Sequence, residues 1–227
     1  MHLQKIQANM KNNVYVIIPA YNEGKRILEV IKQAKNYAKN IVVVDDGSKD
    51  ETCNIAEKTG VDVLNHIINL GKGAALKTGC DYAVSNGAKK LIVMDADGQH
   101  NPSEIPHFLK SLNDADIVFG YRQLKEAPLV FKFGNRFINL STKLLYGLNL
   151  KDTQSGFRAF TNSCYKKIRW KANDYSMESE MIANVGKHNL KYKEIPIKTI
   201  YRDKYKGTTV LDGIKIVFNM ILWKIKK

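Results

Sequence analysis

The sequence has few cysteines, no long apolar run and no apolar segment near its start. Its three cysteines, Cys53, Cys80 and Cys164, are far apart and match no metal-binding spacing, which argues against a disulfide-stabilised domain and a cysteine zinc site. We therefore expect reduced, structural thiols of an intracellular protein. Residues 1–13 are polar and do not have the pattern of a signal peptide. No run approaches the roughly 18 apolar residues of a membrane span.

Two common nucleotide-binding motifs are also missing. Gly71, Lys72 and Gly73 lack the spacer and the Lys-Ser/Thr ending of a P-loop, and the chain contains no GxGxxG sequence. These absences argue against P-loop kinase or ATPase chemistry and against a dinucleotide-dependent reductase.

The size and composition are typical of one globular domain, with 227 residues, 44% hydrophobic and 26% charged. We expect this domain at residues 14–227, after a flexible tail at 1–13. The net charge of +14 is uneven, because Lys and Arg number 14 against 14 Asp and Glu up to Gly120 but 22 against 8 beyond it. This asymmetry predicts a neutral nucleotide-binding half, 14–120, and a basic half, 121–227, that faces phosphate, anionic lipid or nucleic acid. A merely solubilising charge excess is the alternative.

Short apolar runs alternate with helical patterns along the first half of the chain. The runs predict buried strands at residues 14–19, 41–44, 61–64, 91–94 and 117–119. Between them, Ser48 and Glu51 have the spacing of a helix capping box, and Pro102 suits the first position of a helix. The alternation predicts an α/β domain with a mostly parallel sheet sandwiched by helices, so the loops after the strands should meet at one edge.

Two carboxylates, Asp95 and Asp97, follow the strand at 91–94 with only Ala96 between them. Alternate side chains of an extended chain point the same way, so the two acids can bind one cation. Mg²⁺ and Mn²⁺ commonly take one or two carboxylates and complete their shell with water and substrate phosphates. We therefore predict a divalent-metal site at this strand end, where open α/β sheets bind ligands. A solvated turn is the alternative.

Five short motifs occur in order over most of the chain. They are Ile18–Glu23, Val44–Ser48 with Asp50 and Thr52, Gly71–Leu76, Asp95–His100 with Pro102, and Asp152–Arg158. In this order they resemble the inverting GT-A glycosyltransferases of family 2, specifically the dolichyl- and polyprenyl-phosphate sugar synthases. The resemblance implies a GT-A (Rossmann-like) fold with C-terminal amphipathic helices, a nucleotide-sugar donor, and Mg²⁺ or Mn²⁺ as cofactor.

The resemblance also implies roles for residues near the strand ends. Base and ribose contacts are expected from Pro19, Tyr21, Glu23, Val44 and Asp46, and metal ligation from Asp95, Asp97 and Gln99. Lys72, Ala96 and Arg202 complete the expected nucleotide-sugar contacts, although Gly207 is followed by threonines where family members often carry a lysine. Asp97 is a catalytic candidate, because a metal would neutralise the charge that builds on the departing nucleoside diphosphate.

In the family the acceptor is a lipid-linked monophosphate at the membrane face. We expect its phosphate to contact Arg122, Lys132, Arg136 and Ser155, with Arg122 and Glu180 as further catalytic candidates. Little general-base catalysis is needed, since the second pKa of a phosphate monoester is about 6. Apolar residues at helical spacing in 131–148 and 210–225 predict amphipathic helices. Membrane-interface binding and packing against the rest of the protein are alternatives for both helices.

These patterns predict a metal-dependent, inverting transferase that moves a hexose from GDP-mannose or a UDP-sugar to a polyprenyl or dolichyl phosphate. We expect a peripheral protein at the cytoplasmic face of the cell membrane, held by its own helices or by a membrane partner, and with no nucleic-acid partner. A transferase acting on a glycan or protein hydroxyl is the second interpretation, which needs a base such as Glu180 or Asp152. A basic module that binds membrane or nucleic acid without catalysis is the third.

Overall fold

A computed structural model of the protein describes residues 13–123, 129–198 and 210–225. Within these ranges the strands form one seven-stranded sheet in the order β3-β2-β1-β4-β6-β5-β7. They are β1 (Val14–Ala20), β2 (Asn40–Asp45), β3 (Asp62–Asn65), β4 (Lys90–Val93), β5 (Ile117–Arg122), β6 (Arg158–Thr161) and β7 (Tyr192–Ile197). Neighbouring strands are parallel except on the two sides of β6. The prediction of a mostly parallel sheet is therefore confirmed.

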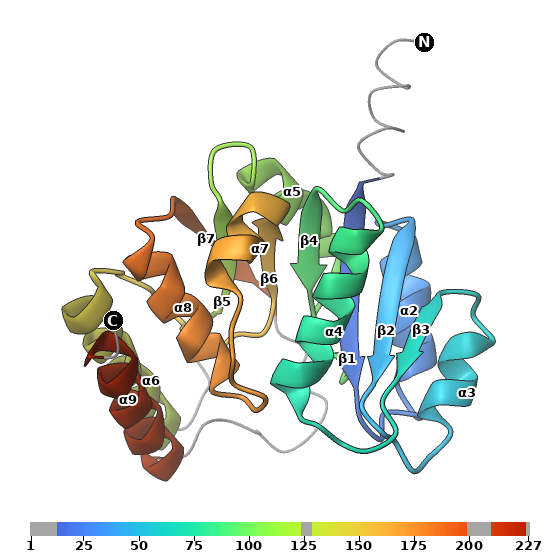
Figure 1. The fold of residues 1–227 in the computed structure, drawn as a ribbon, viewed down its shortest axis with the longest axis horizontal. Coiled ribbons are helices and arrows are strands. Elements are labelled where there is room, and N and C mark those ends of the chain that lie inside the picture. Colours follow the sequence, from blue (N-terminus) through green and yellow to red (C-terminus); the bar gives the residue numbers. More distant parts are fainter. Residues whose placement is uncertain (1–12, 124–128, 199–209, 226–227) are drawn as a thin grey trace.

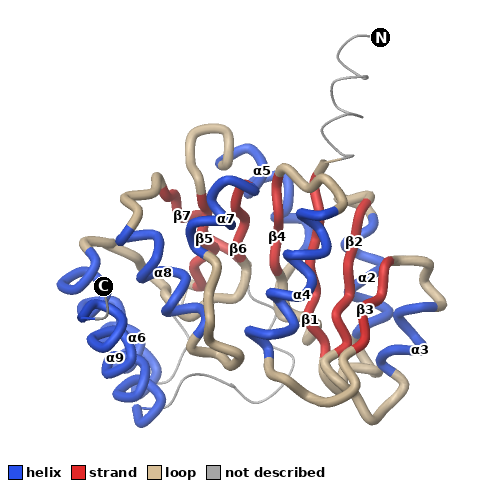
Figure 2. The backbone as a smooth tube through the Cα atoms, in the orientation of Figure 1, coloured by secondary structure: helices blue, strands red, loops and turns tan. Residues whose placement is uncertain are grey.

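Helices cover both faces of this sheet, as Figure 1 shows. One face carries α4 (Lys72–Ser85), α7 (Asn162–Ile168) and α8 (Met177–Lys187), and the other carries α2 (Ile27–Lys35), α3 (Thr52–Glu57) and α5 (Ile105–Ser111). A short 3-10 turn, η1 (Pro102–Glu104), precedes α5, with Asn101 Oδ1 accepting the Ser103 N–H at 3.0 Å. Pro102 thus begins this helical segment as predicted. The strands lie between two helical layers (Figure 2).

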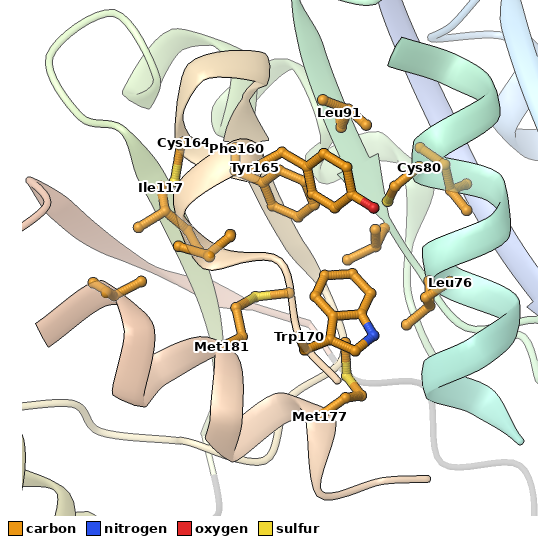
Figure 3. Close-up of a cluster of buried hydrophobic side chains, with 14 of the residues drawn as sticks. Leu76, Cys80, Leu91, Ile117, Phe160, Cys164, Tyr165, Trp170, Met177 and Met181 are labelled. Carbon is orange, nitrogen blue, oxygen red and sulfur yellow. The ribbon is translucent and has the colours of Figure 1, made fainter. Parts of the chain in front are cut away.

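The core consists of two hydrophobic clusters, because side chains of the central strands alternate between the two faces. In β1, Tyr15 and Ile17 belong to one cluster while Val16 and Ile18 belong to the other. In the first cluster Trp170 lies between α4 and α8 (Figure 3), and its Nε1–H donates to the Gly73 carbonyl at 2.8 Å. This contact fixes the start of α4 against the segment that leads to α8.

The helices α6 (Leu129–Tyr146) and α9 (Val210–Ile225) lie side by side next to α8 (Figure 1). Ile138 of α6 packs against Ile216 and Met220 of α9. Other large apolar side chains of the pair are exposed, namely Phe137, Leu140 and Leu144 of α6 and Phe218, Ile221 and Leu222 of α9. Both segments are thus helices with one buried and one apolar exposed face. Among the described residues, none of the helices is long and apolar enough to cross a membrane.

One local prediction is wrong, and one strand is not predicted. Ser48 does not cap a helix, because its hydroxyl donates to the Asp45 carboxylate, and α3 begins only at Thr52, with Asp50 Oδ1 accepting the Thr52 N–H at 3.0 Å. The strand β6 was also not expected, since its four residues include Arg158 and form no apolar run.

Candidate active site

A cavity of about 800 Å³ lies where the carboxyl ends of β1, β2, β4 and β5 meet the amino end of β6. The segments at these strand ends contribute Pro19, Ala20, Tyr21, Glu23, Asp46, Asp95, Ala96, Asp97, Gln99, His100, Arg122, Gln154, Ser155 and Gly156 to its wall. Lys72, Glu178 and the loop 174–176 line it from the side of α4 and α8, and Ile216 and Asn219 from α9. The expectation that the strand-end loops meet at one edge is therefore confirmed.

The acidic pair after β4 faces this cavity. Asp97 Oδ1 accepts the Gln99 N–H at 2.9 Å, and the Asp95 N–H donates to His100 Nδ1 at 3.0 Å. These bonds fold the loop so that both carboxylates line one space. Burial opposes ionisation of Asp95, but Lys72, His100 and Arg122 outweigh it and lower the pKa of this carboxyl to about 2. Burial lowers the pKa of His100, whose ring stacks on Phe157 at a centroid distance of 5.0 Å.

Lys72, at the first position of α4, lies between two carboxylates. Its Nζ is 2.8 Å from Asp95 Oδ1 and 2.9 Å from Glu178 Oε1. Burial opposes the charge of the ammonium, but the two carboxylates raise the pKa of Lys72 well above its ordinary value. The Tyr175 ring centroid lies 5.4 Å from Nζ. At neutral pH this side chain is therefore a fixed cation inside the cavity.

The glycines beside Lys72 permit a close backbone contact. A Cβ added at Gly73 would lie 2.4 Å from the Ala172 carbonyl oxygen, and one at Gly71, whose φ is +97°, would lie 2.5 Å from the Asn173 carbonyl oxygen. The N–H groups of Gly73 and Ala74 donate to that Asn173 oxygen at 2.7 and 3.2 Å. The Gly-Lys-Gly sequence thus joins α4 to the segment before α8, which brings Glu178 to Lys72.

Asp46, after β2, is held in one orientation. Its carboxylate accepts the N–H groups of Leu70 and Gly71 at 3.0 and 2.8 Å. It also contacts His66 Nδ1 at 2.7 Å, and His66 Nε2 is 3.0 Å from the Thr78 hydroxyl. A carboxylate only accepts hydrogen bonds, so Nδ1 is assigned the ring proton. No sequence motif marks His66, which meets Asp46 only through the tertiary fold.

Pro19, Tyr21, Glu23 and Ala96 line the cavity as expected for nucleotide-sugar contacts, and Tyr21 is 43% exposed. The expectation for Val44 is wrong. Its side chain is fully buried in the hydrophobic cluster beneath α4, close to Gly79. The strand alternation directs it into the core and away from the cavity.

Arg122, at the end of β5, forms a two-point ion pair with the buried Asp152. Its Nε and one Nη lie 2.7 and 3.1 Å from the two Asp152 oxygens, and the same carboxylate accepts the Gln154 N–H at 3.1 Å. Ser155 lines the cavity, although its hydroxyl accepts the Phe157 N–H at 3.4 Å. Asp152 therefore fixes both the arginine and the loop that leads to Ser155.

Arg158, the first residue of β6, supports this loop from within the protein. Its guanidinium donates to the carbonyl oxygens of Ser155, Thr153 and Glu178 at 3.0, 2.9 and 3.0 Å. Burial lowers the pKa of Arg158 to about 10. One buried side chain thus ties the loop before β6 to the first turn of α8.

The expectation for Glu180 as a catalytic contact is not supported. Its carboxylate accepts the N–H groups of Lys171 and Ala172 at 2.8 to 3.0 Å, and it does not line the cavity. Glu178, two residues earlier, is the one that reaches Lys72. Both glutamates occupy the first turn of α8, so the sequence shows that one can face inward but not which one.

Of the other expected phosphate contacts, only the side chain of Arg136 lies within the described residues. Lys132 and Arg136 are both within α6, four residues apart as predicted, and the exposed Arg136 does not line the cavity. Arg202 lies outside the described residues.

The sequence model of glycosyl transferase family 2 matches residues 15–169. The chain belongs to glycosyl transferase family 2. It is 44% identical to an uncharacterised protein of Methanocaldococcus jannaschii, over 95% of this chain and 93% of that protein. It is 36% identical to the UDP-N-acetylglucosamine–dolichyl-phosphate N-acetylglucosaminyltransferase of Methanococcus voltae, over 94% of this chain and 97% of that enzyme.

The fold of this family 2 glycosyltransferase is that of solved GT-A structures. Glucosyl-3-phosphoglycerate synthase from Mycobacterium tuberculosis, crystallised with Mn²⁺, UDP and phosphoglyceric acid, superposes with a TM-score of 0.71 at 19% identity, over 96% of this chain and 80% of that one. The predicted GT-A fold is confirmed. Membership of a glycosyltransferase family also makes the protein an enzyme, which excludes the interpretation as a non-catalytic basic module.

The cavity of this glycosyltransferase has a donor set that fits a divalent cation. Asp95, Asp97 and Gln99 offer carboxylate and amide oxygens to one space, which are the ligand types that Mg²⁺ and Mn²⁺ prefer. Among the described residues no group of three or more His, Cys, Asp or Glu side chains is placed to hold a metal ion by itself. Mg²⁺ is commonly bound through only one or two carboxylates, with water and substrate phosphates completing its shell.

Proposed function

We propose that the enzyme transfers a sugar from a UDP-sugar to the phosphate of a dolichyl or polyprenyl phosphate, with inversion at the anomeric carbon and with Mg²⁺ or Mn²⁺ as cofactor. The observation that carries the proposal is that an acidic pair, Asp95 and Asp97, and two cations, Lys72 and Arg122, line one cavity. The relative from Methanococcus voltae, which is similar over 97% of its length, is named for this donor and this acceptor class.

The nucleotide would occupy the side of the cavity formed by Pro19, Tyr21, Glu23 and Asp46. Tyr21 offers an aromatic ring to the base, and the carboxylate of Asp46 suits hydroxyl or imino N–H donors of the nucleoside. Because two backbone N–H groups and His66 already hold Asp46, its orientation does not have to be fixed when the donor binds.

Asp95 and Asp97 would hold the cation, which would supply charge neutralisation for a nucleoside diphosphate leaving group. Lys72 adds a permanent positive charge beside this position, because its pKa is raised well above the ordinary value. The Arg122 guanidinium, which pairs with Asp152, adds a second positive charge on the side of the cavity next to β6. Positive charges fixed before the reaction stabilise a leaving group that becomes more negative.

A phosphate acceptor fits the state of the carboxylates in the cavity. Asp46 accepts three hydrogen bonds, Glu178 and Asp95 pair with Lys72, and Glu23 pairs with Arg26. Asp97 and Asp174 each accept a backbone N–H. The pKa of Asp95, lowered to about 2, makes this group a weak base. A phosphate monoester is largely ionised at neutral pH, so it can attack without losing a proton to the enzyme.

The exposed apolar faces of α6 and α9 support a lipid-linked acceptor. Phe137, Leu140 and Leu144 are 50, 55 and 77% exposed, and Arg136 and Lys143 lie on the same exposed helix. Since α9 also supplies Ile216 and Asn219 to the cavity wall, a membrane against this pair would present a lipid phosphate to the site. We therefore propose peripheral binding to the cytoplasmic membrane face through α6 and α9.

The test measures transfer of radiolabelled sugar from UDP-N-acetylglucosamine, UDP-glucose and GDP-mannose to extracted polyprenyl phosphate, with water-soluble hydroxyl acceptors and 3-phosphoglycerate in parallel. We expect organic-extractable product from a UDP-sugar and a loss of at least 100-fold in the Asp97→Asn variant. Asp114→Asn makes the same chemical change at an exposed ion pair with Lys193 and should keep full activity. Product only with a water-soluble acceptor, or an active D97N enzyme with unchanged metal dependence, would refute the proposal.

A further inference from the structure

Lys72 is bound directly to a carboxylate that the proposed function assigns to the metal. Its Nζ lies 2.8 Å from Asp95 Oδ1, which is the distance of a strong charge-assisted hydrogen bond. A divalent cation ligated by the same carboxylate would come close to this ammonium, and like charges at that separation repel. The ammonium and the metal ion are therefore competitors for Asp95.

The backbone around the pair leaves the lysine little room to move away. A Cβ at Gly156 would lie 2.8 and 2.9 Å from the two Asp95 oxygens and 2.9 Å from Lys72 Nζ, so the glycine backbone covers this side of the ion pair. On another side lies the Tyr175 ring, 5.4 Å from Nζ. A lysine that gives up Asp95 stays inside the cavity wall.

Glu178 gives the displaced ammonium a partner. Its Oε1 lies 2.9 Å from the same Nζ, and only 5% of its side chain is exposed. Because the contact to Glu178 already exists, Lys72 can release Asp95 through a small side-chain rotation and remain paired with a buried carboxylate. The charge of the ammonium therefore never has to be buried without a counterion.

We propose that Lys72 is the built-in counterion of the metal site: it pairs with both Asp95 and Glu178 before metal binds, and it releases Asp95 and keeps only Glu178 when the metal arrives. This inference rests on the proposed function only in placing the cation at Asp95. Glu178 is then a positioning residue, which acts through Lys72. The arrangement makes the free enzyme bind metal weakly and keeps a positive charge next to the diphosphate once metal is bound.

The experiment measures Mn²⁺ binding to the full chain by electron paramagnetic resonance, with no nucleotide or lipid present. We expect Lys72→Met to lower the dissociation constant for Mn²⁺ at least tenfold. Lys72→Arg keeps the charge and should bind Mn²⁺ as weakly as the wild type. Lys77→Met removes a positive charge from the same helix at a position that does not line the cavity, so it controls for long-range charge and should leave the constant within twofold.

A second measurement does not depend on the folding of a variant. In a crystal structure of the wild-type protein soaked with Mn²⁺, Lys72 Nζ should lie more than 3.5 Å from Asp95 and remain within hydrogen-bonding distance of Glu178.

In the Glu178→Gln variant Mn²⁺ binding should weaken severalfold, whereas Glu57→Gln, at an exposed position of α3, should have no effect.

A K72M protein that binds Mn²⁺ no more tightly than the wild type, or a K77M protein that gains as much affinity, would refute the inference. So would a Mn²⁺-bound crystal structure in which the 2.8 Å contact to Asp95 is retained. None of these measurements uses sugar transfer, so a wrong acceptor assignment and a wrong role for Lys72 give different results.

Discussion

Replacing Gly73 by alanine tests whether the clash of an added Cβ with residues 172–174 costs more stability than the higher helix propensity of alanine contributes. The added Cβ would lie 2.4 Å from the Ala172 carbonyl oxygen and 2.9 Å from the Asn173 carbonyl carbon. Both are backbone atoms, so neither can rotate away as a flexible side chain would. Overpacking of this kind costs about 1–3 kcal/mol. A displaced segment would also lose the Gly73 N–H bond to Asn173 O, worth about 1 kcal/mol.

Helix propensity acts in the opposite direction, because alanine is favoured over glycine within a helix by about 1 kcal/mol. The sum is a net destabilisation of about 1–3 kcal/mol, which lowers the melting temperature by roughly 2–12 °C for a chain of this size. The moved segment leads into α8 and Glu178, so we expect sugar transfer to fall more than tenfold.

Thermal unfolding followed by circular dichroism, together with the transfer assay, measures both effects. Gly60→Ala is a useful control, because a Cβ there meets no atom within 4 Å and the only penalty is a φ of +72°, about 1–2 kcal/mol. That variant should lose stability and keep its activity. If the G73A protein instead melts at a higher temperature and transfers sugar normally, propensity dominates and the close approach is unimportant.

Three further substitutions give distinct results. His66→Ala removes a side-chain donor to Asp46. UDP affinity measured by calorimetry should fall about 5–10-fold, which corresponds to the roughly 1 kcal/mol of one hydrogen bond. Unchanged affinity would show that His66 does not orient Asp46. Glu180→Gln weakens charge-assisted hydrogen bonds to backbone N–H groups. It should lower the free energy of unfolding by about 1.5–3 kcal/mol and change kcat less than threefold. A catalytic role for Glu180 predicts the opposite result, a large loss of kcat at normal stability. The depressed pKa of Asp95 contributes stability that is present above the ordinary value of 3.8 and is lost as pH falls toward about 2. Urea titrations of Asp95→Asn should therefore show a shallower decline in unfolding free energy between about pH 4 and pH 2 than the wild type, and an equal decline would contradict this linkage.

The strands that border the donor side could be predicted from the sequence because each is a continuous apolar run. β1, β2 and β4 are buried on both faces, which removes polar residues from them and makes them recognisable. The same property hides which way each side chain points, so nothing in the sequence contradicts the resemblance that places Val44 in the nucleotide pocket, although its side chain faces the core. A buried strand carries no polar alternation that would mark its two faces.

Residues that depend on long-range contacts could not be predicted in the same way. His66 reaches Asp46 across 20 positions of the chain, and Lys72 reaches Glu178 across 106. The choice between Glu178 and Glu180 depends on how α8 packs against α4, which the local sequence pattern does not determine. The acids at 95 and 97 are recognisable because they are only two residues apart in the loop that directly follows β4.

The carbonyl of Asn173 has a further consequence for how a diphosphate can be held. In many nucleotide-binding folds the bare N-terminus of a helix supplies amide hydrogens and a partial positive charge to a phosphate group. Here the amides of Gly73 and Ala74 already donate to the Asn173 carbonyl oxygen. This oxygen offsets the partial positive charge at the N-terminus of α4, which is then not available to a phosphate group. Attraction for the donor must then come from mobile ions and charged side chains, and nucleotide affinity should decline steeply with ionic strength and with chelation.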